Sequence, residues 1–119
     1  GKTVILVYPV PEVGWNVPEY LARAEMHNIR SGRQISTSYA RFVERNAQTV
    51  ELLDSLGSRP RLFRVNPAAE LCDSYEKNRC VAQLDGAPLY FDDNHLNSVG
   101  AAPIVRTILD RIENADNSE

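Results

Sequence analysis

The sequence predicts an α/β fold with parallel strands, and two observations favour it. Residues 2–10 form a continuous β-branched and apolar run that proline ends, which is typical of a strand covered on both faces. The order of this strand, a helix over residues 36–56 and a second short strand over Arg61 to Val65 implies a right-handed parallel crossover. A chain of 119 residues corresponds to one small domain or to part of a larger one.

The first strand is predicted to end in a loop, which leads into a short helix. Pro9 and Pro11 cannot donate to a strand ladder, so the loop runs on to Trp15. Asn16 is placed to cap the helix, with Glu19 three residues later as in a capping box. We expect this helix to fade near residues 31–32.

Residues 36–56 predict the most regular helix of the chain. Their apolar residues recur at intervals of three and four, and Gly57 is placed to end the pattern. These apolar residues are Tyr39, Phe42, Val43, Ala47, Val50 and Leu53.

A β-hairpin and a final helix complete the predicted elements. Residues 81–84 and 88–91 flank Asp85-Gly86, a strong two-residue turn signal. Asn97 or Ser98 can cap the last helix, and its tail after Glu113 is expected to fray. The apolar stripe of that helix comprises Ala101, Ile104, Val105, Ile108 and Ile112, with Pro103 in its first turn or two.

These elements are too few for an independent sheet. Two parallel strands with about three helices leave both sheet edges unpaired and give the helices little to cover. We therefore expect the chain to be the C-terminal half of an α/β sandwich, completed by a companion piece or by a swapped dimer.

Composition and charge exclude several classes of function. The 43% apolar and 24% charged residues are those of an ordinary globular protein. The 13 basic and 16 acidic residues are scattered, which argues against nucleic acid or an anionic membrane as the main partner. No apolar run approaches the roughly 20 residues of a membrane-spanning helix, and the first residues do not resemble a signal peptide. A soluble segment is expected.

Cys72 and Cys80 are the only cysteines, and they bracket a short polar loop. A disulfide would fix a segment that is too polar to be fixed by burial, and it would suit an oxidising compartment. Zinc is the poorer interpretation, because the other candidate ligands, His27 and His95, lie far off in sequence. A reduced pair remains an alternative.

Asp92 precedes His95 by three positions in the loop before the last helix. At this spacing the carboxylate can accept a hydrogen bond from one imidazole nitrogen, which leaves the other nitrogen free to take a proton. This is the base-and-orienter pair of nucleophilic acyl transfer. The alternative is an exposed acidic turn that caps the last helix.

Residues 90–101, Tyr-Phe-Asp-Asp-Asn-His-Leu-Asn-Ser-Val-Gly-Ala, resemble the final motif of SGNH hydrolases. More narrowly, the chain resembles the C-terminal part of the SGNH domain of membrane-bound bacterial O-acyltransferases, which acetylate lipopolysaccharide O-antigen and related glycans. The resemblance covers nearly the whole chain. Its further motifs are residues 10–15, residues 67–72, Cys80 and residues 85–90.

The resemblance implies a flavodoxin-like three-layer sandwich in which a serine from an early Gly-Asp-Ser motif attacks an acyl group. His95 is then the general base, and Asp92 orients it and stabilises its protonated form. No Gly-Asp-Ser occurs in this sequence. Ser74 follows an aspartate without a preceding glycine, so it is not expected to be the nucleophile. Residues 1–119 are therefore expected to be the C-terminal portion of one SGNH-type domain and to be inactive alone.

The function implied is O-acetyl transfer to a cell-surface glycan at the periplasmic face of the bacterial inner membrane. The expected partners are an N-terminal SGNH segment that carries the serine, a membrane acyltransferase domain, a glycan acceptor and an acyl donor. No cofactor or metal is expected. The alternatives are a carbohydrate acetylesterase and a non-catalytic module that binds glycan or acyl donor. A nucleotide-binding or response-regulator-like protein is disfavoured, because no Gly-rich phosphate loop or acidic cluster at a strand end is present.

Several other residues also need an interpretation. Trp15 can line an acceptor site, since indole offers a flat apolar face to a sugar, or it can be a half-buried structural residue. Tyr90 can support the loop of His95 or pack in the hairpin. Asp93 and His27 are expected to be exposed. The arginines at positions 59, 61 and 64 can attract an anionic glycan or serve solubility.

Overall fold

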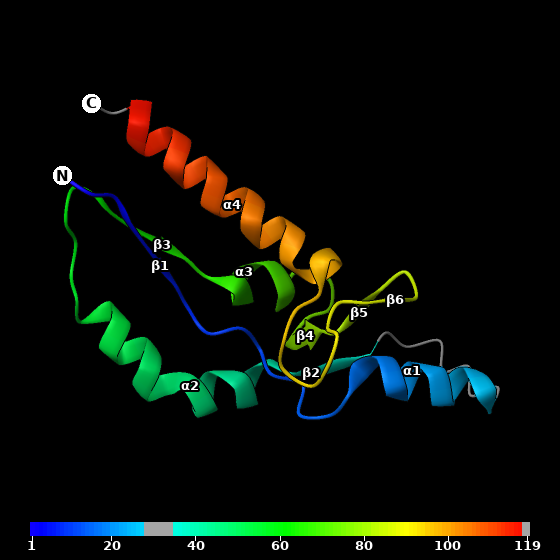
Figure 1. Cartoon of the computed structure of the whole chain (residues 1–119). Coiled ribbons are helices and arrows are strands. Elements are labelled where there is room, and N and C mark those ends of the chain that lie inside the picture. Colours follow the sequence, from blue (N-terminus) through cyan, green and yellow to red (C-terminus); the bar gives the residue numbers. More distant parts are fainter. Residues whose placement is uncertain (28–34, 118–119) are drawn as a thin grey trace.

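The computed structural model describes residues 1–27 and 35–117, and it is mixed α/β (Figure 1). The elements are, in order, β1 (Val4–Val7), α1 (Val17–Met26), β2 (Ser36–Ser38), α2 (Tyr39–Asp54), β3 (Leu62–Val65), α3 (Pro67–Leu71), β4 (Arg79–Val81), β5 (Gln83–Leu84), β6 (Ala87–Pro88) and α4 (Ser98–Asn117). Short parallel and antiparallel strand pairs make up its sheets.

The predicted parallel strands are present as the β1–β3 pair. The register runs from Val4 opposite Leu62 to Val7 opposite Val65. In Figure 1, α4 lies along one side of this pair and α2 along the other. Helix α2 belongs to the crossover connection that the parallel strands β1 and β3 need, whereas α4 comes after both strands.

The prediction that the first strand is covered on both faces is wrong for the described part of the chain. Val4 is 49% exposed and Val7 is 47% exposed. Among the described residues, β1 pairs with β3 alone, so a strand-like apolar run lacks the neighbours that would bury it.

The predicted helix over residues 36–56 is shorter, because Ser36–Ser38 form β2. This strand pairs antiparallel with β4, which the sequence did not predict. The side chain of Arg79 in β4 donates to the Oγ and the carbonyl of Ser36, at 2.9 and 2.8 Å. Helix α2 begins after Ser38, whose hydroxyl caps it, and Gly57 follows its end with a φ of 71°.

The predicted hairpin is also narrower than expected. Asp85 and Gly86 turn between β5 and β6 with φ angles of 51° and 80°, as an Asp-Gly turn requires. Val81 belongs instead to β4, where it pairs with Ser36 of β2, and residues 89–91 pass into the loop before α4. Pairing with β2 therefore removes Val81 from the predicted hairpin.

The helix caps agree with the sequence. Of two predicted helix ends, one differs from the structure and the other lies outside the described residues. Asn16 caps α1 by accepting from the Glu19 amide at 3.0 Å, and the predicted end near residues 31–32 lies outside the described residues. The tail after Glu113 was expected to fray, yet α4 continues to Asn117. Ala115 is buried, which gives this last turn a packing contact.

The apolar stripe of α4 is only partly covered. Ile104 is buried and Ile108 packs against the core, whereas Val105 and Ile112 are 48% and 41% exposed. None of the described helices is long and apolar enough to cross a membrane.

The main core lies where the hairpin, the loop after β1 and the start of α4 meet. Its buried members are Val13, Val17, Val65, Leu71, Val81, Ala82, Leu89, Tyr90 and Ile104. This core underlies the loop of Asp92 and His95, because Leu89 and Tyr90 lead directly into it.

Candidate functional site

Backbone hydrogen bonds close residues 89–97 into a compact loop between β6 and α4. Tyr90 and Leu96 form an isolated antiparallel bridge, and the Phe91 amide donates to the His95 carbonyl at 3.0 Å. Residues at both ends of the loop are thereby held together, and Asp92 and His95 lie within one short turn.

Asn97 joins this loop to α4. Its side-chain amide donates to the Pro88 carbonyl at 2.7 Å, and its Oδ1 accepts from the Val99 and Gly100 amides, both at 3.0 Å. Gly100 allows the close approach, because a Cβ there would lie 2.2 Å from the Leu89 carbonyl oxygen. The start of α4 is therefore fixed against the end of the hairpin.

Asp92 uses both carboxylate oxygens. Oδ1 accepts from the amides of Asn94 and His95, at 2.9 and 2.7 Å, and Oδ2 lies 2.7 Å from His95 Nδ1. Partial desolvation pushes the pKa of Asp92 up, but the hydrogen bonds from Asn94 and His95 outweigh it and hold this pKa below its ordinary value. Asp92 is thus an ionised partner for the imidazole.

His95 is oriented from two sides and still faces solvent. Its side chain is 65% exposed, against 30% for Asp92. The Phe91 ring stacks on the imidazole with centroids 5.4 Å apart and planes 10° apart. When Nδ1 carries the ring proton and donates to Asp92, Nε2 is an acceptor, and it has no hydrogen-bond partner in residues 1–27 and 35–117.

The stacking role of Phe91 was missed by sequence reasoning. The signal available was an aromatic residue four positions before His95 in a short loop. That signal is weak, because only the bridge between Tyr90 and Leu96 brings the two rings face to face.

Within the described part of the chain, no serine hydroxyl forms a hydrogen bond with His95. The Ser74 hydroxyl donates to the Glu70 carbonyl at 2.7 Å, as expected of a structural residue. The described residues thus supply a base and its orienting carboxylate, which can take a proton from a nucleophile supplied by another segment.

The loop after β1 is joined to the candidate site. The Val13 and Gly14 amides donate to the Asp93 carbonyl, at 2.9 and 3.2 Å. Tyr90 is buried, which raises the pKa of its phenol, and its hydroxyl donates to the Pro11 carbonyl at 2.5 Å. Tyr90 therefore supports the loop of His95, and it does so through the segment that carries Trp15.

A cleft of about 510 Å³ opens beside this segment. Trp15 forms part of its wall, is 37% exposed and packs on Tyr20 with ring centroids 5.0 Å apart. The wall also includes Glu12, Ser36, Arg41, Arg45, Asn46 and Arg79. The volume falls in the range of about 300–1,000 Å³ that is usual for small-molecule sites.

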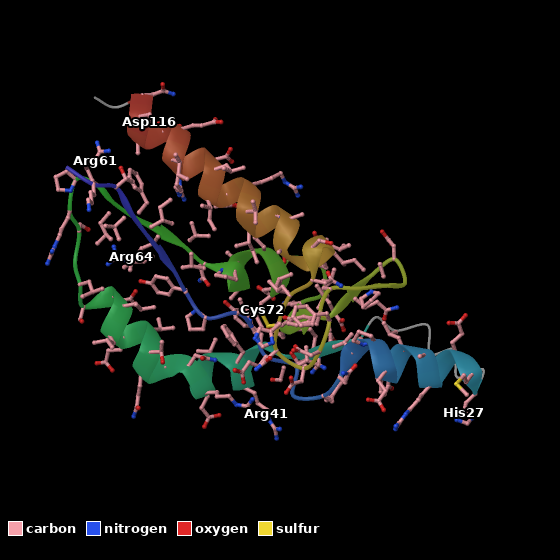
Figure 2. All side chains as sticks on the ribbon, in the orientation of Figure 1. His27, Arg41, Arg61, Arg64, Cys72 and Asp116 are labelled. Atoms are coloured by element: carbon pink, nitrogen blue, oxygen red, sulfur yellow. A yellow bond between two sulfur atoms is a disulfide. The ribbon has the colours of Figure 1, made fainter. Side chains whose placement is uncertain are left out.

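Cys72, at the end of α3, and Cys80, in β4, form a disulfide (Figure 2). Both are buried, next to Ala68, Tyr39 and Phe42. The zinc interpretation of these cysteines is therefore wrong, because their sulfur atoms are bonded to each other. Among residues 1–27 and 35–117, no three His, Cys, Asp or Glu side chains are grouped as metal ligands.

His27, Arg61 and Arg64 lie away from the loop of His95. Figure 2 shows His27 at the far tip of α1. Arg61 donates to Thr3, and Arg64 donates to the Tyr8 hydroxyl at 2.9 Å and to the Gly57 carbonyl at 2.8 Å. These two arginines thus tie β3 to β1 and to the end of α2.

Comparison with known proteins identifies a family for this chain. A family model described as an SGNH domain (fused to AT3 domains) matches residues 1–110. No curated protein matches the chain, and no solved structure matches it.

Proposed function

This chain belongs to the family of SGNH domains that are fused to AT3 domains, and we propose that it supplies Asp92 and His95 to serine-dependent O-acyl transfer. Family membership places the chain in an acyltransferase-associated SGNH module. The proposed reaction moves an acetyl group to a hydroxyl of a cell-surface glycan, such as lipopolysaccharide O-antigen.

The observation that carries this proposal is the contact between His95 Nδ1 and Asp92 Oδ2 at 2.7 Å, beside an imidazole that is 65% exposed. A histidine that serves only structure would be expected to use both nitrogens or to be buried. Here one nitrogen is oriented by a carboxylate and the other is accessible, which is the arrangement a general base needs.

The chemistry proceeds in two balanced steps. In the first, His95 Nε2 takes the serine proton while the serine oxygen bonds to the acyl carbon, and the departing donor group then takes that proton. In the second, Nε2 takes the proton of the glycan hydroxyl, whose oxygen bonds to the acyl carbon, and the serine oxygen leaves and regains the proton. Asp92 stabilises the imidazolium that forms in each step.

We assign the serine to an N-terminal SGNH segment, so that residues 1–119 are the C-terminal portion of one flavodoxin-like domain. The chain exposes 8187 Å², whereas a folded monomer of 13.3 kDa exposes roughly 6,450 Å². The excess of roughly 1,700 Å² is about twice what one partner buries in a standard protein interface. The Cα radius of gyration of 16.4 Å, against roughly 13.5 Å for a compact chain of this length, supports the same view.

We propose that the module works at the periplasmic face of the inner membrane. The buried Cys72–Cys80 disulfide supports an oxidising compartment. The AT3 domains of the family support a membrane acyltransferase domain as the partner that delivers the acyl donor.

The test compares His95→Ala with His27→Ala in the complete protein. Loss of the general base should lower acyl transfer by about 10²-fold to 10⁴-fold or more. His27→Ala is the matched control, because it removes the other histidine of the chain, and it should retain activity. Full activity of His95→Ala in folded protein would remove His95 from the mechanism.

A fluorophosphonate probe separates catalysis from a role in binding alone. The complete protein should be labelled on one serine outside residues 1–119, and His95→Ala should slow the labelling. A folded complete protein that carries no reactive serine would instead be a non-catalytic binding module.

A further inference from the structure

We propose that the cleft beside Trp15 binds an acidic sugar unit of the glycan acceptor, one that bears a carboxylate or a phosphate. This inference deepens the proposed function, and it rests on that function only in identifying the bound sugar as part of the acceptor. The binding itself can be tested without acyl transfer.

Charge is the first observation. Arg41, Arg45 and Arg79 line the cleft, and Glu12 is the only acidic residue among the described residues of its wall. None of these three arginines forms an ion pair within residues 1–27 and 35–117. The surplus positive charge lies in a chain whose net charge is −3, so it is a local feature that composition hides.

The placement of the arginines is the second observation. Arg41 and Arg45 are one turn apart on α2, where two like charges disfavour the helix. Arg79 is held in place across the β2–β4 pair by its hydrogen bonds to Ser36. A planar guanidinium that is fixed by its neighbours is prepared to bind a carboxylate or a phosphate, and a bound anion would relieve the repulsion on α2.

The part of the wall that Trp15 forms suits a sugar ring. Trp15 presents a partly exposed indole and is itself supported by Tyr20. An indole packs against the apolar face of a pyranose, while the cleft's polar groups, such as Ser36 and Asn46, can meet its hydroxyls. Indole and guanidinium together therefore select a saccharide with an anionic substituent over a simple anion.

The cleft is connected to the candidate catalytic loop. The segment of Glu12 and Trp15 also contains Val13 and Gly14, whose amides donate to the Asp93 carbonyl. A ligand held against this segment therefore contacts a stretch of chain that is hydrogen-bonded to the loop of His95. This position is appropriate for a unit that neighbours the hydroxyl to be acylated.

The experiment uses the complete protein and three probes: glucuronate, glucose-6-phosphate and glucose. Binding is measured by ligand-observed NMR, which detects millimolar affinities. At least one of the two acidic sugars should bind more tightly than glucose, and Arg41→Gln with Arg45→Gln should weaken that binding by about tenfold or more. The two acidic probes distinguish a carboxylate from a phosphate as the preferred group.

Arg59→Gln with Arg106→Gln is the matched control, because it removes the same charge from exposed positions outside the cleft. The control should bind as the unchanged protein does. Equal binding of glucose and both acidic sugars, no binding of any probe, or equal weakening by the two double variants would overturn the inference.

The same samples separate this inference from the proposed function. His95→Ala should bind the acidic sugar normally while it loses acyl transfer. Normal acyl transfer by His95→Ala, together with weakened sugar binding by the Arg41 and Arg45 double variant, would refute the catalytic role of His95. The proposal that the cleft binds an acidic sugar would still stand.

Discussion

At the scale of single residues, the candidate site depends on the two oxygens of Asp92. One oxygen is held by the amides of Asn94 and His95, and the other meets the imidazole. The first set of contacts fixes the carboxylate, and the second sets the tautomer of His95. Replacing the Asp92 carboxylate by an amide therefore tests the effect of its charge separately from the effect of its position.

Asp92→Asn should lower kcat/KM for acyl transfer by less than His95→Ala does. The imidazole keeps a hydrogen-bond partner, although its preferred tautomer is disturbed. Asp93→Asn is the matched control, because the structure uses the backbone carbonyl of Asp93 and this variant keeps it. A loss equal to that of His95→Ala would mean that the charge and orientation of Asp92 are indispensable.

The Asp92 carboxyl should titrate below its reference pKa of 3.8. Because its pKa in the folded state is lowered, its contribution to stability is present above the unfolded-state pKa. That contribution is lost as the pH falls through the folded-state pKa. Carboxyl carbon NMR measures the midpoint, which should rise in His95→Ala when one donor is removed. A midpoint at or above 3.8 in the unchanged protein would contradict the observed hydrogen bonds.

Some of this site could be predicted from the sequence and some could not. Asp92 and His95 are three positions apart, so their contact needs only a local turn. The roles of Tyr90 and Asp93 depend on the distant segment around Pro11 and Val13, and no local pattern specifies which segment packs there.

At the scale of elements, the contact between α4 and the hairpin depends on Gly100. Alanine is normally the better helix former, by roughly 0.5–1 kcal/mol. Here a Cβ would lie 2.2 Å from the Leu89 carbonyl oxygen, so the start of α4 must move.

Gly100→Ala should therefore destabilise the complete SGNH domain by about 1–3 kcal/mol, despite its favourable helix propensity. Denaturant unfolding measures the change, with Val99→Ala as the control at an exposed neighbouring position. Acyl transfer should fall as well, because Asn97 and the loop of His95 share this contact. A stabilised Gly100→Ala variant would show that the approach can relax without cost.

Local signals predicted the elements that form locally. The caps at Asn16 and Asn97 and the turn at Asp85 act over a few residues, and the structure contains all of them. Strand β2 was missed because its three residues continue into a strong helical pattern. Only pairing with β4, far along the chain, makes them extended.

At the scale of the whole molecule, the uncovered apolar surface is the main feature. Val105, Leu109 and Ile112 lie four and three residues apart on α4, and all three are exposed. The count of strands led us to expect a companion piece, but it did not predict where the exposed apolar surface would lie, because that position depends on how α4 packs.

We expect this chain alone to self-associate and the complete SGNH domain to remain monomeric, because the N-terminal segment would cover α4. Light scattering after size-exclusion chromatography measures both masses. Val105→Glu with Leu109→Glu should reduce self-association of the isolated chain and impair recovery of the complete domain. Leu52→Glu, at an exposed position on α2, is the control. A monodisperse monomer of the isolated chain would argue against a missing companion.

The attachment of α4 at Asn97 also has a mechanical consequence. The helix has 20 residues and is therefore about 30 Å long, and its packing is spread along that length, with Ile104 and Ala115 both buried. The start of the helix beside His95 is thus held by Asn97 and also by contacts farther along α4. A disturbance at the far end of α4 must break those contacts before it can change the position of the imidazole.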